Sequence, residues 1–209
     1  SIKVGDTVQA KVDQHRREAI MRNHSACHLL QSALRRVLGN HVEQAGSYVS
    51  DTVCRFDFTH FAALTETELQ KVEALVNLHI LAANEIVTKE TDIETARAEG
   101  AMALFGEKYG DTVRVVDMSG ASMEFCGGTH LDNTAKIGPF RICSESSIAS
   151  GVRRIEAICG EKYLMETEAL HRKLNEAAET LKTNPAELVA RIKATVQEVK
   201  DLKQTIDKM

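Results

Sequence analysis

The segment Asn23–Gly39, NHSACHLLQSALRRVLG, is the point around which the rest of the fold is predicted. Asn is a favoured helix N-cap and Gly a favoured helix terminator, so the segment predicts a helix over 24–38. Its apolar residues recur every three or four positions, which places them on one helix face. That buried face comprises Cys27, Leu30, Leu34 and Val37.

Beyond this helix, alternating apolar residues and turn signals predict strands. The stretch 47–58 predicts a hairpin whose turn is Ser50-Asp51. Thr65 and Glu68 form a capping box, which predicts a second helix up to Ala83. Further strands are predicted over 4–12, 112–118, 123–125, 140–143 and 152–159. Helices and strands are interspersed without a regular βαβ rhythm, so the fold class is α+β, with one sheet layer and one helix layer.

The C-terminal stretch 161–209 differs from the rest because it contains neither Gly nor Phe. Its apolar residues form two helical stripes, and Asn184-Pro185 marks the start of the second helix. The second stripe follows a heptad pattern. We therefore expect an antiparallel helical hairpin or coiled-coil arm, which serves as a structural arm or as a dimerisation element. The predicted domains are the end of an upstream β subdomain (1–15), a main domain (16–160) and this arm (161–209).

Composition and charge exclude several classes of protein. Hydrophobic residues make up 43% of the 209 residues, which is too many for a disordered chain. No run approaches the roughly 20 apolar residues of a membrane span, and the N-terminus lacks a signal peptide, so no membrane partner and a cytoplasmic location are expected. The net charge of −4 argues against non-specific coating of nucleic acid. The absence of an initiator Met suggests a piece of a longer protein.

Two pairs of residues have the spacing of metal ligands. His24 and His28 are four positions apart on the predicted helix, so both imidazoles project from one side. Cys126 and His130 are also four positions apart, on a turn that contains two glycines. One sulfur and three nitrogen ligands suit zinc. The alternative is that the histidines are surface residues and Cys126 is a buried thiol. Three other cysteines, Cys54, Cys143 and Cys159, alternate with apolar residues and are expected in the core.

Small and neutral residues beside these pairs suggest a place for a substrate. Gly127 and Gly128 have no side chains and let a ligand approach backbone N–H groups. Gln44, which precedes a predicted strand, offers an amide that can hydrogen-bond a small polar group. A surface turn explains the composition around Gln44 equally well. Arg153 and Arg154 form a basic pair that could face a phosphate, although such a pair is more often a solvated surface.

Several motifs together resemble successive signatures of the editing domain of alanyl-tRNA synthetase, in the order of that family. They extend over residues 1–160, and the stretch after 161 resembles the helical segment that follows editing in the synthetase. Two departures are Cys27, where the family often has Thr, and Ala45, where it often has Lys. The motifs are Asn23–Leu30, His41–Ser47, Arg55–Phe58, Ala103–Gly110, Cys126–His130 and Gly151–Ala157.

The resemblance implies an editing hydrolase, an aminoacyl-tRNA deacylase, that cleaves serine or glycine from the acceptor end of tRNA(Ala). It also implies Zn²⁺ as the cofactor and an aminoacylation core that lies upstream, so that this piece does not bind ATP. It assigns no water-activating group. Self-association through the C-terminal helices is expected from their heptad pattern. The implied zinc ligands are His24, His28, Cys126 and His130, and the implied substrate-binding residues are Gln44, Gly127, Gly128 and Thr129. Two alternatives stay open, a free-standing editing deacylase and a non-catalytic structural zinc module that binds tRNA.

Overall fold

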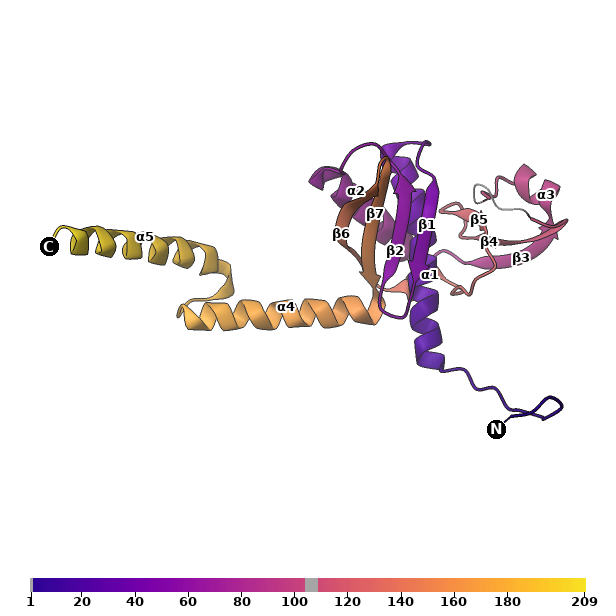
Figure 1. Cartoon of the computed structure of the whole chain (residues 1–209), viewed down its shortest axis with the longest axis horizontal. Coiled ribbons are helices and arrows are strands. Elements are labelled where there is room, and N and C mark those ends of the chain that lie inside the picture. Colours follow the sequence, from indigo (N-terminus) through magenta and orange to yellow (C-terminus); the bar gives the residue numbers. More distant parts are fainter. Residues whose placement is uncertain (1, 104–108) are drawn as a thin grey trace. The chain divides into compact units, whose positions relative to one another are not determined.

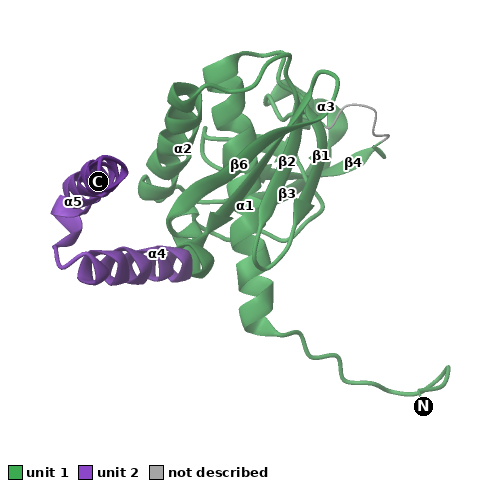
Figure 2. Cartoon of the chain, turned by 60° about the vertical axis from the view of Figure 1, so that its left-hand side comes forward, with its two compact units in different colours: residues 1–163 green, residues 164–209 purple. Residues whose placement is uncertain are grey.

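The computed structural model describes residues 2–103 and 109–209, and the chain divides into two compact units, 1–163 and 164–209 (Figure 2). The larger unit contains two antiparallel sheets together with several helices, which confirms the α+β class. Part of the motif at 103–110, residues 104–108, lies outside the described residues.

A four-stranded antiparallel sheet forms the centre of the larger unit, and two helices cover one of its faces (Figure 1). In spatial order its strands are β1 (Gln44–Val49), β2 (Cys54–Thr59), β7 (Val152–Cys159) and β6 (Phe140–Ala149). The covering helices are α1 (Gln14–Leu38) and α2 (Glu66–Leu81). Phe56 and Phe58 of β2 point into the layer between sheet and helices and pack with Leu30 of α1 and Val76 of α2. This layer is the main hydrophobic core.

The first helix confirms the predicted apolar face but not its predicted start. It begins at Gln14, and the side chain of Asp13, not Asn23, caps it by accepting a hydrogen bond from the backbone N–H of Arg16. Asp and Asn are equally favoured as N-caps, and α1 begins after the earlier of the two residues, Asp13. Asn23 is instead buried in mid-helix, where its amide donates to the backbone carbonyl of Ser50 at 3.0 Å. It thereby ties α1 to the β1–β2 hairpin.

The predicted hairpin and the predicted capping box are both confirmed. β1 pairs with β2, and Val49 lies opposite Cys54 next to the turn. Thr65 accepts from the backbone N–H of Glu68, while the Glu68 carboxylate accepts from the backbone N–H of Thr65. Strand β7 has the predicted limits, 152–159, whereas β6 continues beyond the predicted residue 143 to Ala149.

A smaller three-stranded antiparallel sheet follows α2. It consists of β3 (Val87–Asp92), β4 (Thr112–Asp117) and β5 (Met123–Phe125), and a short helix α3 (Ile93–Ala98) lies between β3 and β4. Strands β4 and β5 agree with the prediction. Strand β3 and helix α3 were not predicted, because the β3 sequence VTKETD is mostly polar and exposed. This sheet has its own small core, built on Val113, Val115 and Phe125.

Residues 2–13 do not form the strand that was predicted over 4–12. Val4, Val8 and Val12 are exposed, and no described residue pairs with this segment. A strand needs a partner for its backbone groups, which explains why the alternating pattern alone does not produce one. That the segment ends an upstream β subdomain stays a prediction.

The C-terminal region contains the two predicted helices, α4 (Gly160–Thr180) and α5 (Leu188–Asp207). A short 3₁₀ helix (Pro185–Glu187) precedes α5, and the Asn184 side chain caps it as predicted. Ala178 and Leu188, near the connection, are buried, but most stripe residues are exposed, for example Leu170, Ile192 and Leu202. The structure therefore contains both helices, whereas a hairpin that buries both stripes stays a prediction. None of the helices in the described part of the chain is long and apolar enough to cross a membrane.

Candidate metal centre

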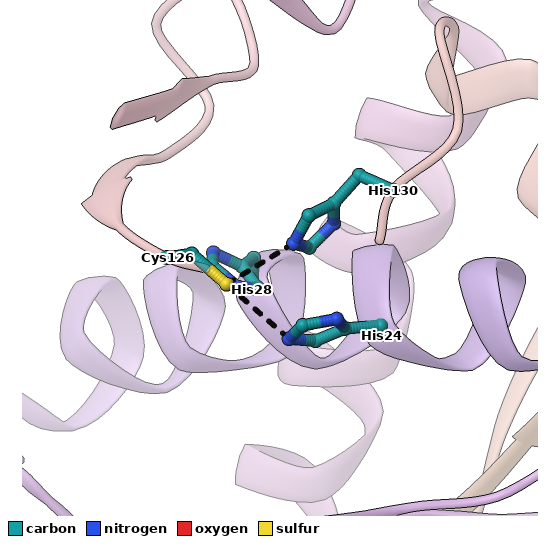
Figure 3. Close-up of side chains that lie close together, drawn as sticks. All are labelled: His24, His28, Cys126 and His130. Atoms are coloured by element: carbon teal, nitrogen blue, oxygen red, sulfur yellow. Dashed lines mark hydrogen bonds between the residues drawn. The ribbon is translucent and has the colours of Figure 1, made fainter. Parts of the chain in front are cut away.

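The four predicted ligands come together in one cluster (Figure 3). His24 and His28 project from α1, Cys126 directly follows β5, and His130 lies four residues further along the same loop. Their ligand atoms all lie within 4.8 Å of one another. The cluster thus joins the first helix to the small sheet, across 102 positions between His24 and Cys126.

The distances inside the cluster fit a tetrahedral metal ion. Cys126 Sγ lies 3.5 Å from His24 Nε2 and 3.3 Å from His130 Nε2. A tetrahedral zinc ion with bonds of 2.0–2.3 Å separates its ligand atoms by about 3.5 Å. The arrangement of these side chains is therefore compatible with one zinc ion between them.

The orientation of the imidazoles also fits metal binding, because each ring directs Nδ1 towards a protein group. His24 Nδ1 lies 3.3 Å from the carbonyl oxygen of Thr129, His130 Nδ1 lies 3.1 Å from Ser25 Oγ, and His28 Nδ1 lies 3.1 Å from Glu124 Oε2. An outer partner of this kind fixes the ring of a metal-binding histidine and its tautomer. Nε2 is then the nitrogen left for a metal in all three residues.

Burial and the contacts between cluster members shift the pKa values of Cys126, His28 and His130. Burial disfavours a charged Cys126, but contacts with His130, His24 and His28 outweigh it and lower the pKa of Cys126 to about 3. Burial also disfavours a charged His28, but Glu124 and Cys126 outweigh it and raise the pKa of His28 to about 10. Burial, assisted by the neighbouring His28 and His24, lowers the pKa of His130 to about 4. A metal cation would take the place of the His28 proton and face the same negative groups.

The turn that carries Cys126 is held in place by an arginine and a glycine. Arg114 of β4 donates to the carbonyl oxygens of Cys126 and Gly128 at 2.7 and 2.6 Å. A Cβ built at Gly128 would collide with the ring of His24, whereas one at Gly127 meets nothing within 4 Å. Gly128 is thus needed for the close approach of the ring, and the open side of the turn is at Gly127.

A small cavity of about 90 Å³ adjoins the cluster. Gln44 lies in its wall, and its amide donates to Ser47 Oγ at 3.3 Å, while its role in substrate binding stays a prediction. Of the other predicted substrate-binding residues, Gly127, Gly128 and Thr129 belong to the neighbouring turn and not to this wall. The lining residues are His24, Cys27, His28, Gln31, Gln44, Ser47, Phe56, Glu124, Phe125 and Cys126.

Two cavity residues were not singled out from the sequence, Gln31 and Glu124. Gln31 follows His24 by seven positions, which is two helix turns, so its place on the ligand face of α1 could have been read from the spacing. Glu124 precedes Cys126 by two positions on a strand-like stretch, which places it on the same side as the ligand.

The basic pair and the other cysteines are partly accounted for. Arg154 forms two hydrogen bonds with Asp57, at 2.6 and 2.7 Å, and Arg153 pairs with Glu145. Each carboxylate raises the pKa of its arginine. Cys54 and Cys159 are buried in the core as predicted, but Cys143 is exposed, which corrects its predicted core position. The reason is that Cys143 lies on β6, an edge strand whose middle is largely exposed.

The comparison with protein families first defines a class. The model of the second additional domain of threonyl and alanyl tRNA synthetases matches residues 113–156. This stretch contains β5, β6, most of β4 and β7, and two of the four cluster residues. Over residues 113–156 the chain is therefore similar to an accessory domain of aminoacyl-tRNA synthetases.

Individual relatives of the chain are alanine–tRNA ligases. The chain is 54% identical to alanine–tRNA ligase 1 of Lachnoclostridium phytofermentans over 200 residues, which cover 96% of the chain and 23% of the relative. It is 53% identical to the alanine–tRNA ligase of Pelotomaculum thermopropionicum over 96% of the chain and 23% of that relative, and 49% identical to that of an Acidovorax species over 99% and 24%. The resemblance is confirmed: the chain is homologous to a segment, about a quarter of the length, of alanine–tRNA ligases.

Proposed function

We propose that this chain is the editing segment of an alanine–tRNA ligase and hydrolyses the ester of Ser-tRNA(Ala) and Gly-tRNA(Ala). The observation that carries this proposal is the cavity of about 90 Å³, bounded by three of the four cluster residues on one side and by Gln44 and Ser47 on the other. A cavity of this size suits a small aminoacyl group. The homology to alanine–tRNA ligases supplies tRNA(Ala) as the partner.

A separate hydrolytic site has a physical reason in this class of enzyme. A pocket shaped for alanine excludes larger side chains, but it rejects glycine weakly because only one methyl group is missing. The same pocket also rejects serine weakly, because serine differs from alanine only by an additional hydroxyl group. A second site that removes the wrong amino acid supplies the missing discrimination.

Different residues of this chain would have different roles in such a site. His24, His28, Cys126 and His130 would hold a zinc ion, and Ser25, Glu124 and the Thr129 carbonyl would keep the rings oriented. When bound, zinc supplies a positive charge that can polarise an ester or orient water. Gln44 and Ser47 offer an amide and a hydroxyl to the polar atoms of the aminoacyl group. The open backbone at Gly127 lets the terminal ribose approach the turn.

A structural zinc module is the second candidate, and the ligand count favours it. Four protein ligands close a zinc site, whereas catalytic sites usually keep one position for water or substrate. Deacylation of serine-charged tRNA(Ala), measured with zinc and after chelation, separates the two candidates. Hydrolysis that depends on the metal supports the editing proposal. A folded, zinc-loaded chain that leaves the ester intact supports the structural module.

A further inference from the structure

Gln31 is a residue of the cavity wall whose amide forms no hydrogen bond within the described ranges 2–103 and 109–209. Only 7% of the residue is exposed. Two other polar side chains of the wall are engaged: the Gln44 amide donates to Ser47 Oγ at 3.3 Å, and Glu124 accepts from Ser122 Oγ at 2.6 Å. Gln31 lies on α1 one turn beyond His28, so its amide reaches the cavity from the ligand face of the helix.

A carboxamide in a cavity wall that has no protein partner is free to hydrogen-bond a molecule that enters the cavity. The amide has one acceptor oxygen and an NH₂ donor, and both are available to a molecule in the cavity. Around it stand the apolar walls Cys27, Phe56 and Phe125, which leave room for a small side chain. The combination of a small apolar chamber and one unpaired amide matches a short side chain that ends in a hydroxyl.

We propose that Gln31 recognises the side-chain hydroxyl of a seryl group bound in this cavity, and thereby separates serine from alanine. This inference rests on the proposed function and deepens it. A serine hydroxyl donates to the amide oxygen of Gln31 or accepts from its NH₂ group. An alanyl methyl group does neither and leaves the buried amide unpaired, so correctly charged tRNA is bound less well. A glycyl group is small enough to enter the cavity, but it has no side-chain group that can hydrogen-bond Gln31.

The test replaces the amide by an apolar group of similar length. Gln31→Met and, as a second apolar variant, Gln31→Leu are compared with Gln70→Met, which alters an exposed glutamine on α2 outside this cavity. The rate constant kcat/KM is measured for Ser-tRNA(Ala), Gly-tRNA(Ala) and Ala-tRNA(Ala), together with zinc content. We expect the serine value to fall by roughly 10-fold or more in the Gln31 variants, because one buried hydrogen bond is lost. The kcat/KM for Gly-tRNA(Ala) should stay within about 2-fold, because glycine has no hydroxyl that Gln31 could bond. The zinc content should also stay within about 2-fold.

A parallel loss on serine and glycine substrates, or no loss on either, would overturn the role of Gln31. Binding of non-hydrolysable seryl and alanyl amides of 3′-amino-3′-deoxyadenosine gives a readout that does not require catalysis. A wild-type preference for the seryl amide that disappears in the Gln31 variants supports recognition even if no protein hydrolyses the ester, and only the proposed function then fails. Hydrolysis with an unchanged seryl preference in the variants leaves the proposed function intact and refutes the inference.

Discussion

Gly128 packs directly against the imidazole ring of His24. A Cβ at position 128 would lie 2.6 Å from Nδ1 of that ring and would overlap its Cε1 atom. The two residues belong to opposite halves of the candidate metal centre, α1 and the turn after β5. Their contact therefore sets how closely the two halves approach.

Gly128→Ala is expected to displace His24 and to weaken metal binding, whereas Gly127→Ala, one position earlier, meets no neighbouring atom. The glycine at 128 is required by space, because any Cβ contact below about 3 Å forces one partner to move. Zinc affinity by chelator competition distinguishes the two variants. Equal affinities in Gly127→Ala and Gly128→Ala would contradict this account of the contact.

One zinc ion per chain is expected in protein purified without added metal. The Cys126→Ala variant should lose it, because the thiolate is the only sulfur among the four cluster residues. Metal loss should also lower the thermal midpoint, since the ion joins α1 to a turn about 100 positions away. Metal analysis with a melting curve tests both parts. Less than about half an equivalent in the wild type, or full metal in Cys126→Ala, speaks against the four-ligand site.

Metal exchange should show what the ion does. If the ion positions the ester or a water, replacing zinc by cobalt or cadmium changes the deacylation rate in step with the Lewis acidity of the metal. The comparison needs metal-loaded samples of equal stoichiometry and a stability curve for each. A rate that stays constant while stability shifts identifies the ion as purely structural.

The isolated chain is expected to deacylate Ser-tRNA(Ala) more slowly than a complete alanine–tRNA ligase at low substrate concentration. Its net charge is −4, and Arg153 and Arg154 are already paired with carboxylates, so it neutralises few phosphates. The relevant measurement is kcat/KM for both proteins at two salt concentrations. Equal values at low substrate concentration would show that the rest of the enzyme adds no tRNA affinity.

Asn77→Leu should destabilise the larger unit by about 1–3 kcal/mol, because it removes two hydrogen bonds to a strand edge. The Asn77 side chain donates to the Phe140 carbonyl at 2.9 Å and accepts from the Phe140 N–H at 3.0 Å. Denaturant unfolding measures the loss, with the exposed Gln70→Leu as the matched control. A free energy of unfolding equal to that of the control would assign these bonds no net contribution.

The sequence indicated which four side chains come together in the cluster, because the spacing within each pair is local information. Two pairs with a spacing of four residues, and apolar alternation in β2 and β7, each depend on neighbours in the chain. The start of α1 was missed because Asn23 and Asp13 are equally good caps, and only the packing of Asn23 against Ser50 shows which one is used. Strand β3 was missed for a different reason. Its polar residues acquire strand structure only by pairing with β4, a contact that local sequence does not reveal.

The cavity residues likewise differ in whether they can be recognised from the sequence or only from the structure. The family resemblance pointed to Gln44, whose role in substrate binding stays a prediction. The amide of Gln31 becomes meaningful only when the partners of the surrounding groups are known. Whether a cavity side chain already has a partner depends on hydrogen bonds, which only the structure reveals.

The separation of the two ligand pairs along the chain also fixes an order of assembly during synthesis. A growing polypeptide that ends before residue 130 contains His24 and His28 but not the full ligand set. A metal ion that requires all four side chains is therefore captured only after the small sheet has emerged from the ribosome and has brought Cys126 and His130 to α1. Zinc capture therefore follows the synthesis of residue 130 and does not depend on β6 and β7 having been made.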